Sequence, residues 1–198
     1  DAISWVGPRA LEKMREYVNA NGLVAEPGDA CLIISEYVEG KLYENKAVEI
    51  WNCGDSELAL DDVALCLIRN DEEDCTRSTS LGPRTLAPDD TMVLCRDRDG
   101  NNFSDPVPWI AGPCEVEVGS TAIFSGDDRL ALVRDTNRDE NFSLGEDQVL
   151  DVLGRIGYRP PDSTWKDVRL DRCRLEPNDG QTFYLTDEWF HIEPWSND

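Results

Sequence analysis

Two neighbouring stretches decide the fold of this 198-residue chain: LIISEYVEG at residues 32–40 and KAVEIWN at residues 46–52. The apolar runs here, such as Cys31–Ile34, have the length of a strand, and the apolar residues do not recur at helical spacing. Glu39-Gly40 is a turn signal between them. We therefore predict strands at Cys31–Val38 and Ala47–Asn52.

Short strands of the same kind recur along the rest of the chain, separated by turns rich in Gly, Asn, Asp and Pro. The further predicted strands are Val63–Arg69, Thr91–Cys95, Ser120–Phe124, Leu130–Arg134, Val149–Ile156, Val168–Leu175 and Glu188–Glu193. Many short strands at such spacing predict an all-β sandwich or barrel.

The first 30 residues follow a different pattern. Their apolar residues recur at helical spacing, at Leu11, Met14 and Val18. The basic residues Lys13 and Arg15 lie between them, so the pattern predicts a short amphipathic α-helix of about three turns. We expect a helical extension at residues 1–30 and a β-sandwich domain at residues 31–198.

The order of the β-segments resembles that of bacterial lamin-tail domains, an immunoglobulin-like β-sandwich family. The segments that carry the resemblance are Leu32–Gly40, Lys46–Asn52, Leu58–Asp61 with Val63–Arg69, Leu86–Asp90 with Val93–Cys95, Phe124–Val133, Asp151–Gly157 and Asp187–Trp189. The resemblance covers roughly residues 31–193. It implies an immunoglobulin-like sandwich in a bacterial extracellular or envelope setting, where members often accompany catalytic domains. It implies no activity. The number of cysteines and a polar insertion between Val133 and Val149 depart from the family pattern.

The charge of the chain excludes several classes of partner. There are 41 acidic and 19 basic residues, which give a net charge of −22. A field of this sign repels phosphate backbones and anionic lipids, so we expect no nucleic-acid binding through a basic patch. It favours divalent cations or basic partners. The apolar runs have the length of strands, well below the roughly 20 residues that span a bilayer, so we expect no membrane insertion.

The seven cysteines indicate disulfides. With one histidine and no C-x-x-C motif, a zinc site explains them less simply. Disulfides favour an extracellular or cell-envelope location. The expected pairs are Cys66–Cys75 and Cys95–Cys114 across short loops, and Cys53–Cys173 over a long range. Cys31 is then left over, although many other pairings are possible.

The polar insertion has the residue spacing of an EF-hand calcium loop. Side-chain oxygens stand at its first, third, fifth, ninth and twelfth places, in Asp135, Asn137, Asp139, Ser143 and Glu146, and Asn141 would add a backbone carbonyl from the seventh. Calcium binds about 6–8 oxygens, which alternate residues of a tight loop can supply. The sixth place, normally glycine, is Glu140, whose positive φ would cost about 1 kcal/mol. We expect weak, structural calcium binding, with a solvated acidic hairpin as the alternative.

Other features allow rival interpretations. Residues 97–105 repeat the first three ligand places of the calcium motif, but an Asp/Asn/Gly-rich turn explains them more simply. Glu36 and Glu49 could act as the paired carboxylates of a hydrolase, although an outward polar sheet face is the simpler interpretation. Trp109 and Trp165 fall in loops, where aromatic rings could stack on a sugar.

No common catalytic motif is present, neither a nucleophile elbow, nor a phosphate-binding glycine loop, nor a zinc-binding H-E-x-x-H. The sequence therefore predicts a non-catalytic, exported interaction or scaffold module, stabilised by disulfides and calcium. Its partner would be an unidentified protein or a surface glycan. A carbohydrate-binding module and a hydrolase with paired carboxylates are the alternatives.

Overall fold

The computed structural model of the chain describes residues 31–39, 46–96, 114–159, 165–166, 168–172 and 177–180, and the backbone of residues 189–192. Several sequence predictions fall outside the described residues. These are the helix within residues 1–30, the acidic turn at residues 97–105, Trp109 and Cys173. They remain predictions.

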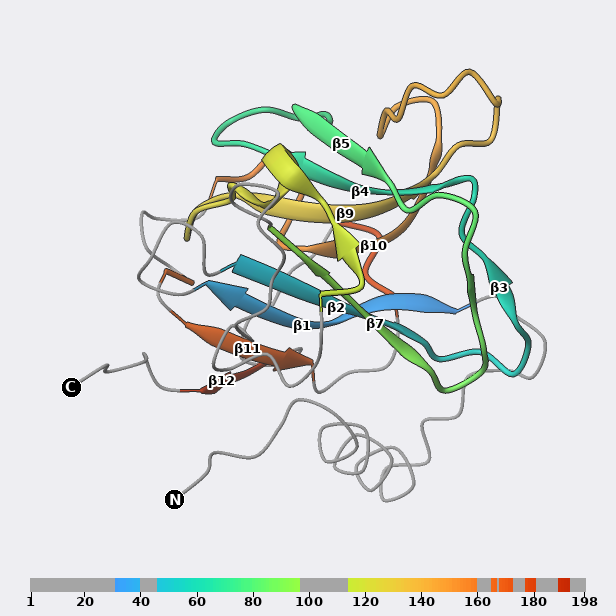
Figure 1. Cartoon of the computed structure of the whole chain (residues 1–198). Coiled ribbons are helices and arrows are strands. Elements are labelled where there is room, and N and C mark those ends of the chain that lie inside the picture. The colour runs from blue at the N-terminus through green and yellow to red at the C-terminus, as the bar shows by residue number, and fades with distance from the viewer. Residues whose placement is uncertain are drawn as a thin grey trace, which may run out of the picture.

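The described strands form two main sheets that face each other as the layers of a sandwich (Figure 1). The six-stranded sheet has the order β12 (Trp189–Ile192), β11 (Arg169–Arg172), β1 (Leu32–Glu39), β2 (Lys46–Asn52), β7 (Thr91–Cys95) and β8 (Val116–Glu117). The four-stranded sheet has the order β10 (Gln148–Leu153), β9 (Arg129–Arg134), β4 (Val63–Ile68) and β5 (Arg77–Ser80). A small third sheet pairs β3 (Leu58–Ala59) with β6 (Thr85–Leu86). Neighbouring strands are antiparallel except for the parallel pair of β7 and β8. The predicted all-β fold is confirmed.

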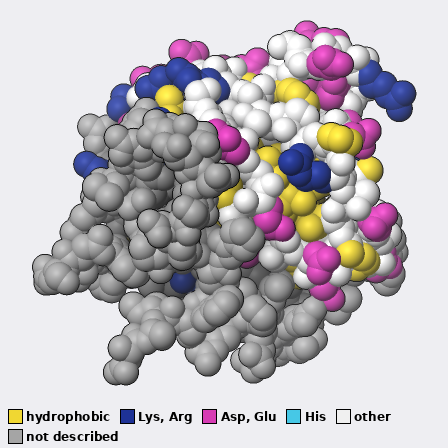
Figure 2. All heavy atoms as spheres, in the orientation of Figure 1, with side chains coloured by type: hydrophobic (Ala, Val, Ile, Leu, Met, Phe, Trp, Pro, Cys, Tyr) yellow, Lys and Arg dark blue, Asp and Glu magenta, His cyan; other side chains and the backbone are white. Residues whose placement is uncertain are grey.

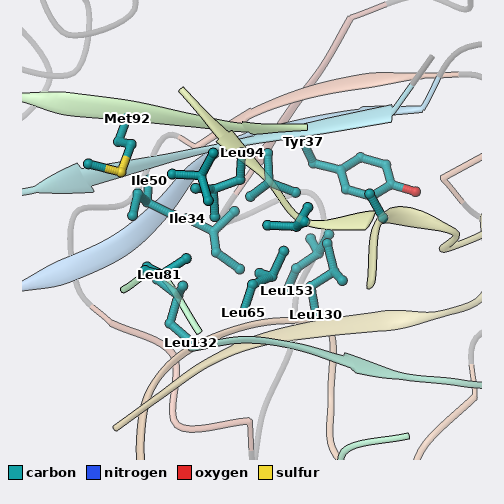
Figure 3. Close-up of a cluster of buried hydrophobic side chains, with 14 of the residues drawn as sticks. Ile34, Tyr37, Ile50, Leu65, Leu81, Met92, Leu94, Leu130, Leu132 and Leu153 are labelled. Atoms are coloured by element: carbon teal, nitrogen blue, oxygen red, sulfur yellow. The ribbon is translucent and has the colours of Figure 1, made fainter. Parts of the chain in front are cut away.

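The hydrophobic core lies between the two sheets. Figure 3 shows Ile34, Tyr37 and Ile50 of the six-stranded sheet facing Leu65 and Leu132 of the four-stranded sheet. All five side chains are buried. Successive side chains of a regular strand point to opposite faces. A bulge in β1 lets Ile34 and Tyr37, which are three residues apart, both point into this core.

The predicted strands and the observed ones differ in places. Ser120–Phe124 is not a strand, because the 3₁₀ helix η1 (Gly119–Ala122) occupies it. The sequence did not predict β3, β6 and β8, because each has only two residues, too few to show a pattern. It did not predict β5, because the sequence of that strand, RSTS, has no apolar residue. Among the described residues, no helix is long and apolar enough to span a membrane.

A buried carboxylate joins the two sheets. Asp151 of β10 accepts hydrogen bonds from the backbone N–H of Ile34 on β1 (2.8 Å), from Nη1 of Arg172 on β11 (2.9 Å) and from the backbone N–H of Asn178 (2.7 Å). The pairing of β1 with β11 begins only at Glu36, after a bulge in β1. The N–H of Ile34 is therefore not used by β11 and can donate to Asp151. A buried carboxylate needs such partners to offset the loss of its hydration. These three hydrogen bonds therefore hold β10 against β1 and β11.

Three disulfides cross-link the described residues. Two are the predicted pairs, Cys66–Cys75 and Cys95–Cys114. The third prediction is wrong, because Cys53 is bonded to Cys31 and not to Cys173. The register of β1 and β2 explains this bond. Leu32 pairs with Asn52, so Cys31 and Cys53 stand opposite each other one position further on, with their Cα atoms 5.0 Å apart.

Candidate functional site

The predicted calcium loop is the connection between β9 and β10, which are adjacent antiparallel strands. In Figure 1 it is the gold loop that projects at the upper right of the sandwich. Asp135 directly follows β9, and β10 begins at Gln148. The loop is thus entered from a strand, as the sequence predicted, and its middle is exposed.

The backbone of this loop turns sharply around one carboxylate. Arg138 and Glu140 both have left-handed conformations, with φ of 63° and 62°. Asp135 accepts the backbone N–H of Arg138 (2.5 Å) with one oxygen and that of Glu140 (2.9 Å) with the other. Glu140 is at the sixth place, where a calcium loop makes its sharp turn with glycine. The chain therefore adopts this turn although a side chain makes it unfavourable.

Hydrogen bonds to the loop's own backbone hold the next two candidate ligands, Asn137 and Asp139, in position. Asn137 accepts the N–H of Asp139, and Asp139 accepts the N–H of Asn141, each at 2.9 Å. Each of these oxygens has a second lone pair for a ligand. Within the described ranges, however, no three Asp, Glu, His or Cys side chains are gathered as a metal site. The loop has the order of a calcium loop, but its side chains do not converge on one point.

Asp147, at the thirteenth place, joins the two halves of the loop. Its Oδ1 accepts the backbone N–H of Thr136 and its Oδ2 that of Ser143, each at 3.0 Å. The predicted twelfth-place ligand, Glu146, is exposed instead. The motif could not reveal Asp147, because the twelve-residue pattern ends one residue earlier.

The second half of the loop rests on the hairpin closed by the Cys66–Cys75 disulfide. Asp74 accepts the backbone N–H of Leu144 (2.7 Å) and the hydroxyl of Ser143 (3.0 Å). Phe142 and Leu144 pack in one hydrophobic cluster with both cysteines. Ser143, the predicted ninth-place ligand, is therefore positioned by a segment about 70 residues earlier in the chain.

These contacts lower the pKa of Asp74. Burial acts to raise this pKa, but the N–H groups of Leu144 and Cys75 and the Ser143 hydroxyl outweigh it. A carboxyl with a lowered folded pKa stabilises the fold above its unfolded pKa, and that contribution disappears as the pH falls through the folded pKa. The contact between the hairpin and the loop is thus complete at neutral pH and weakens only below about pH 4.

A second group of acidic residues lies on the six-stranded sheet. Glu36 of β1 is in register with Glu49 of β2 on one side and with Asp171 of β11 on the other. We call these three residues the acidic row. Glu36 and Glu49 lie on the sheet face that points away from the core, as the simpler interpretation expected. They are nevertheless buried, because Glu36 is only 3% and Glu49 only 7% exposed. Nε of Arg169 lies 2.7 Å from Glu36 and 2.8 Å from Asp171. The one hydrogen on Nε points to Asp171. Glu36 therefore forms an ion pair with Arg169 but no hydrogen bond.

Burial raises the pKa of Glu36 well above its usual value, although Arg169 opposes this effect. The pKa of Glu49 is also raised, mainly by burial, against hydrogen bonds from Ser35 and Thr91. A carboxyl with a raised folded pKa keeps its proton longer in the folded state. Stability therefore falls as the pH rises from the unfolded pKa through the folded one.

The substitution Glu36→Gln tests the predicted direction in which stability changes with pH. At pH 4.5 we expect little change in the free energy of unfolding, because the carboxyl is largely protonated. At pH 7.5 we expect the variant to be more stable than the wild type, because glutamine carries no charge to bury. The gain in the free energy of unfolding should be about 1.4 kcal/mol for each pH unit by which the pKa of Glu36 is raised. Urea unfolding at both pH values measures the difference, with the exposed Glu57→Gln as the control. A loss of stability at pH 7.5 would show that the ion pair with Arg169 outweighs burial.

Trp165 does not form an exposed platform for a sugar. Its side chain is only 1% exposed, and its Nε1–H donates to the backbone carbonyl of Asp128 (3.0 Å). The other residue of that proposed platform, Trp109, lies outside the described residues. In the described part of the face shown in Figure 2, acidic side chains are spread among uncharged ones.

No family model and no curated protein matches the chain.

Proposed function

We propose that the chain is a non-catalytic interaction or scaffold module of lamin-tail type, exported to the cell envelope or beyond, with a structural calcium ion in the loop Asp135–Glu146. The three disulfides support an oxidising location. The absence of common catalytic motifs from the sequence supports the non-catalytic role. The order of the observed strands supports the lamin-tail relation at the segments that suggested it.

One observation carries the calcium proposal: Glu140 has a φ of 62° at the place where a calcium loop requires a sharp turn. A non-glycine residue in this conformation costs about 1 kcal/mol. The hydrogen bonds from Arg138 and Glu140 to Asp135 offset part of that cost. A bound cation would offset more, because its attraction to the carboxylates of Asp135, Asp139 and Glu146 would favour the conformation in which they converge.

The proposed ligands are the side chains of Asp135, Asn137, Asp139, Ser143 and Glu146 and the backbone carbonyl of Asn141. They fit a hard cation, because all are oxygen donors. Glu146 is exposed and would have to turn inward. Bound calcium would hold the long β9–β10 connection in one conformation and so stabilise the sandwich, without taking part in any reaction.

Calcium titration by isothermal calorimetry tests the proposal directly. We expect a dissociation constant on the order of 10⁻⁴ to 10⁻³ M, as in extracellular modules. Asp135→Ala should abolish binding. Asp62→Asn is the matched control, because Asp62 is a half-exposed acid outside the ligand set and contacts Arg134. The absence of calcium binding at millimolar concentration would contradict the proposal.

The substitution Glu140→Gly should stabilise the protein and leave its calcium affinity unchanged. Glycine adopts a positive φ without steric cost, so the calcium-free loop, which already has this φ, should gain about 1 kcal/mol in stability, and the calcium-bound loop should gain the same. Calorimetric titration and urea unfolding of the same variant measure both effects. Weaker calcium binding in this variant would mean that the Glu140 side chain itself contributes to the site.

A further inference from the structure

The six-stranded sheet has a second face that points away from the sandwich core, which we call the outer face. Ile33 of β1 and Trp51 of β2 are paired on it and pack with the Cys31–Cys53 disulfide. Both side chains are buried. The described strands that contact β1 from outside its own sheet, β9 and β10, belong to the layer on the core side (Figure 1). The strands of the four-stranded sheet therefore do not cover this face.

Two buried polar side chains of the outer face, Glu36 and Trp51, lack hydrogen bonds. The acidic row places three carboxylates on neighbouring strands, and Arg169 is the cation that pairs with two of them. Both carboxylate oxygens of Glu36 lack a hydrogen bond, and so does the Nε1–H of Trp51. Both side chains are only 3% exposed. Because buried polar groups in folded proteins are nearly always paired, this face is suited to a partner that has both apolar and basic side chains.

We propose that the outer face is the docking site of the chain's own N-terminal segment, the amphipathic helix predicted between Pro8 and Asn21. Its apolar residues, Leu11, Met14 and Val18, would cover Ile33 and Trp51. Arg15, which flanks the apolar stripe, would lie beside the acidic row, whereas Lys13 would point away from the sheet. This segment has the two kinds of side chain that the face requires, at the spacing of a helix.

The connection between the two parts is long enough for this docking. Cys31 is bonded to Cys53 beside Ile33 and Trp51, so the N-terminal segment is tethered next to the outer face. The ten residues 21–30 can reach at most about 33–36 Å. The eight residues of β1 extend about 26 Å, and a helix of thirteen residues is about 20 Å long. The segment can therefore turn back along the sheet and reach Glu36.

The tether favours this segment over a separate molecule. A covalently linked segment has an effective concentration in the millimolar range. A second copy of the chain, with a net charge of −22, would instead be repelled. Residues 8–21 contain three basic and two acidic residues, so this segment has a small positive charge that the acidic row would attract.

Trypsin cleavage of the 198-residue chain tests the proposal, with the rates followed at the Lys13–Met14 and Arg15–Glu16 bonds by mass spectrometry. A synthetic peptide of residues 1–30 gives the rate for the free segment. We expect cleavage in the chain to be at least about tenfold slower, because a docked helix cannot enter the protease site. Equal rates in the chain and the peptide would overturn the proposal. Protection that depends on protein concentration would also overturn it, since the segment would then dock on another copy.

Two variants locate the docking site. Glu36→Gln with Glu49→Gln keeps the shape of the face but removes its charge, and should accelerate cleavage several-fold. Leu11→Asp with Val18→Asp changes only the segment, so it leaves the sandwich intact and should bring cleavage close to the peptide rate. The exposed Glu57→Gln and Glu117→Gln are the control pair. Unchanged protection in either test variant would overturn the docking on the acidic row.

Discussion

Replacing Asp151 by asparagine is expected to lower the free energy of unfolding by about 3–5 kcal/mol, as breaking a buried ion pair does. Asp151 accepts from three donors, on Ile34, Arg172 and Asn178. Asparagine has one carbonyl oxygen for them, and its NH₂ group would face other donors. In a domain of this size the loss corresponds to a fall in melting temperature of roughly 6–20 °C. Urea unfolding at a fixed calcium concentration measures it.

The matched control for this prediction is Asp62→Asn. Asp62 also contacts an arginine, Arg134, at 3.3 Å, but its side chain is 44% exposed. Exposed ion pairs contribute at most about 1 kcal/mol. If both substitutions cost the same, Asp151 would not be the link between the sheets that its contacts indicate.

The second large effect is expected from removal of the Cys66–Cys75 disulfide by alanine at both positions. This bond closes a short loop, so its loss should cost about 2–4 kcal/mol. It should also weaken calcium binding, because Asp74 of the same hairpin positions Ser143 and Leu144. By linkage, calcium should shift the equilibrium of this disulfide toward the oxidised form. Calorimetric titration gives the affinity, and alkylation after equilibration in a thiol–disulfide buffer gives the fraction of the disulfide that is reduced.

The Cys31–Cys53 bond provides the control for that linkage. It lies on the six-stranded sheet and packs with Ile33 and Trp51, away from the hydrophobic cluster under the calcium loop. Its removal should destabilise the chain to a similar degree and leave the calcium affinity unchanged. If both double substitutions weakened calcium binding equally, the effect would reflect general destabilisation and not the contact of Asp74 with the loop.

The fold could be predicted from the sequence to the extent that strands have a period. The two strands predicted first correspond to β1 and β2, whose residues Ile34 and Ile50 lie in the core. The sequence could not show that Glu36 is buried, because a solvated face and a covered face of a sheet have the same period. The Cys31–Cys53 bond was within reach of the sequence, since the register of β1 and β2 brings both cysteines opposite each other. Assigning Cys53 by elimination overlooked this geometry.

The candidate site, too, could be predicted only in part from the sequence. The spacing of Asp135, Asn137 and Asp139 is a local signal, and the loop is found where the sequence placed it. Asp74 could not be found by spacing, because it reaches the loop only through the pairing of distant strands. Trp165 was misjudged because a tryptophan between strands can be exposed or buried, and only its packing decides. Calcium binding itself remains a prediction.

The melting temperature in calcium, in magnesium and after chelation, at fixed ionic strength, tests the central claim most directly. With 10 mM calcium and the expected affinity, we predict a stabilisation of about 1.4–2.7 kcal/mol, or a rise of roughly 3–10 °C. Magnesium should produce little of this rise, and Asp135→Ala should abolish it. Equal melting temperatures in calcium and chelator, or a calcium-specific rise that persists in Asp135→Ala, would contradict a structural calcium site in this loop.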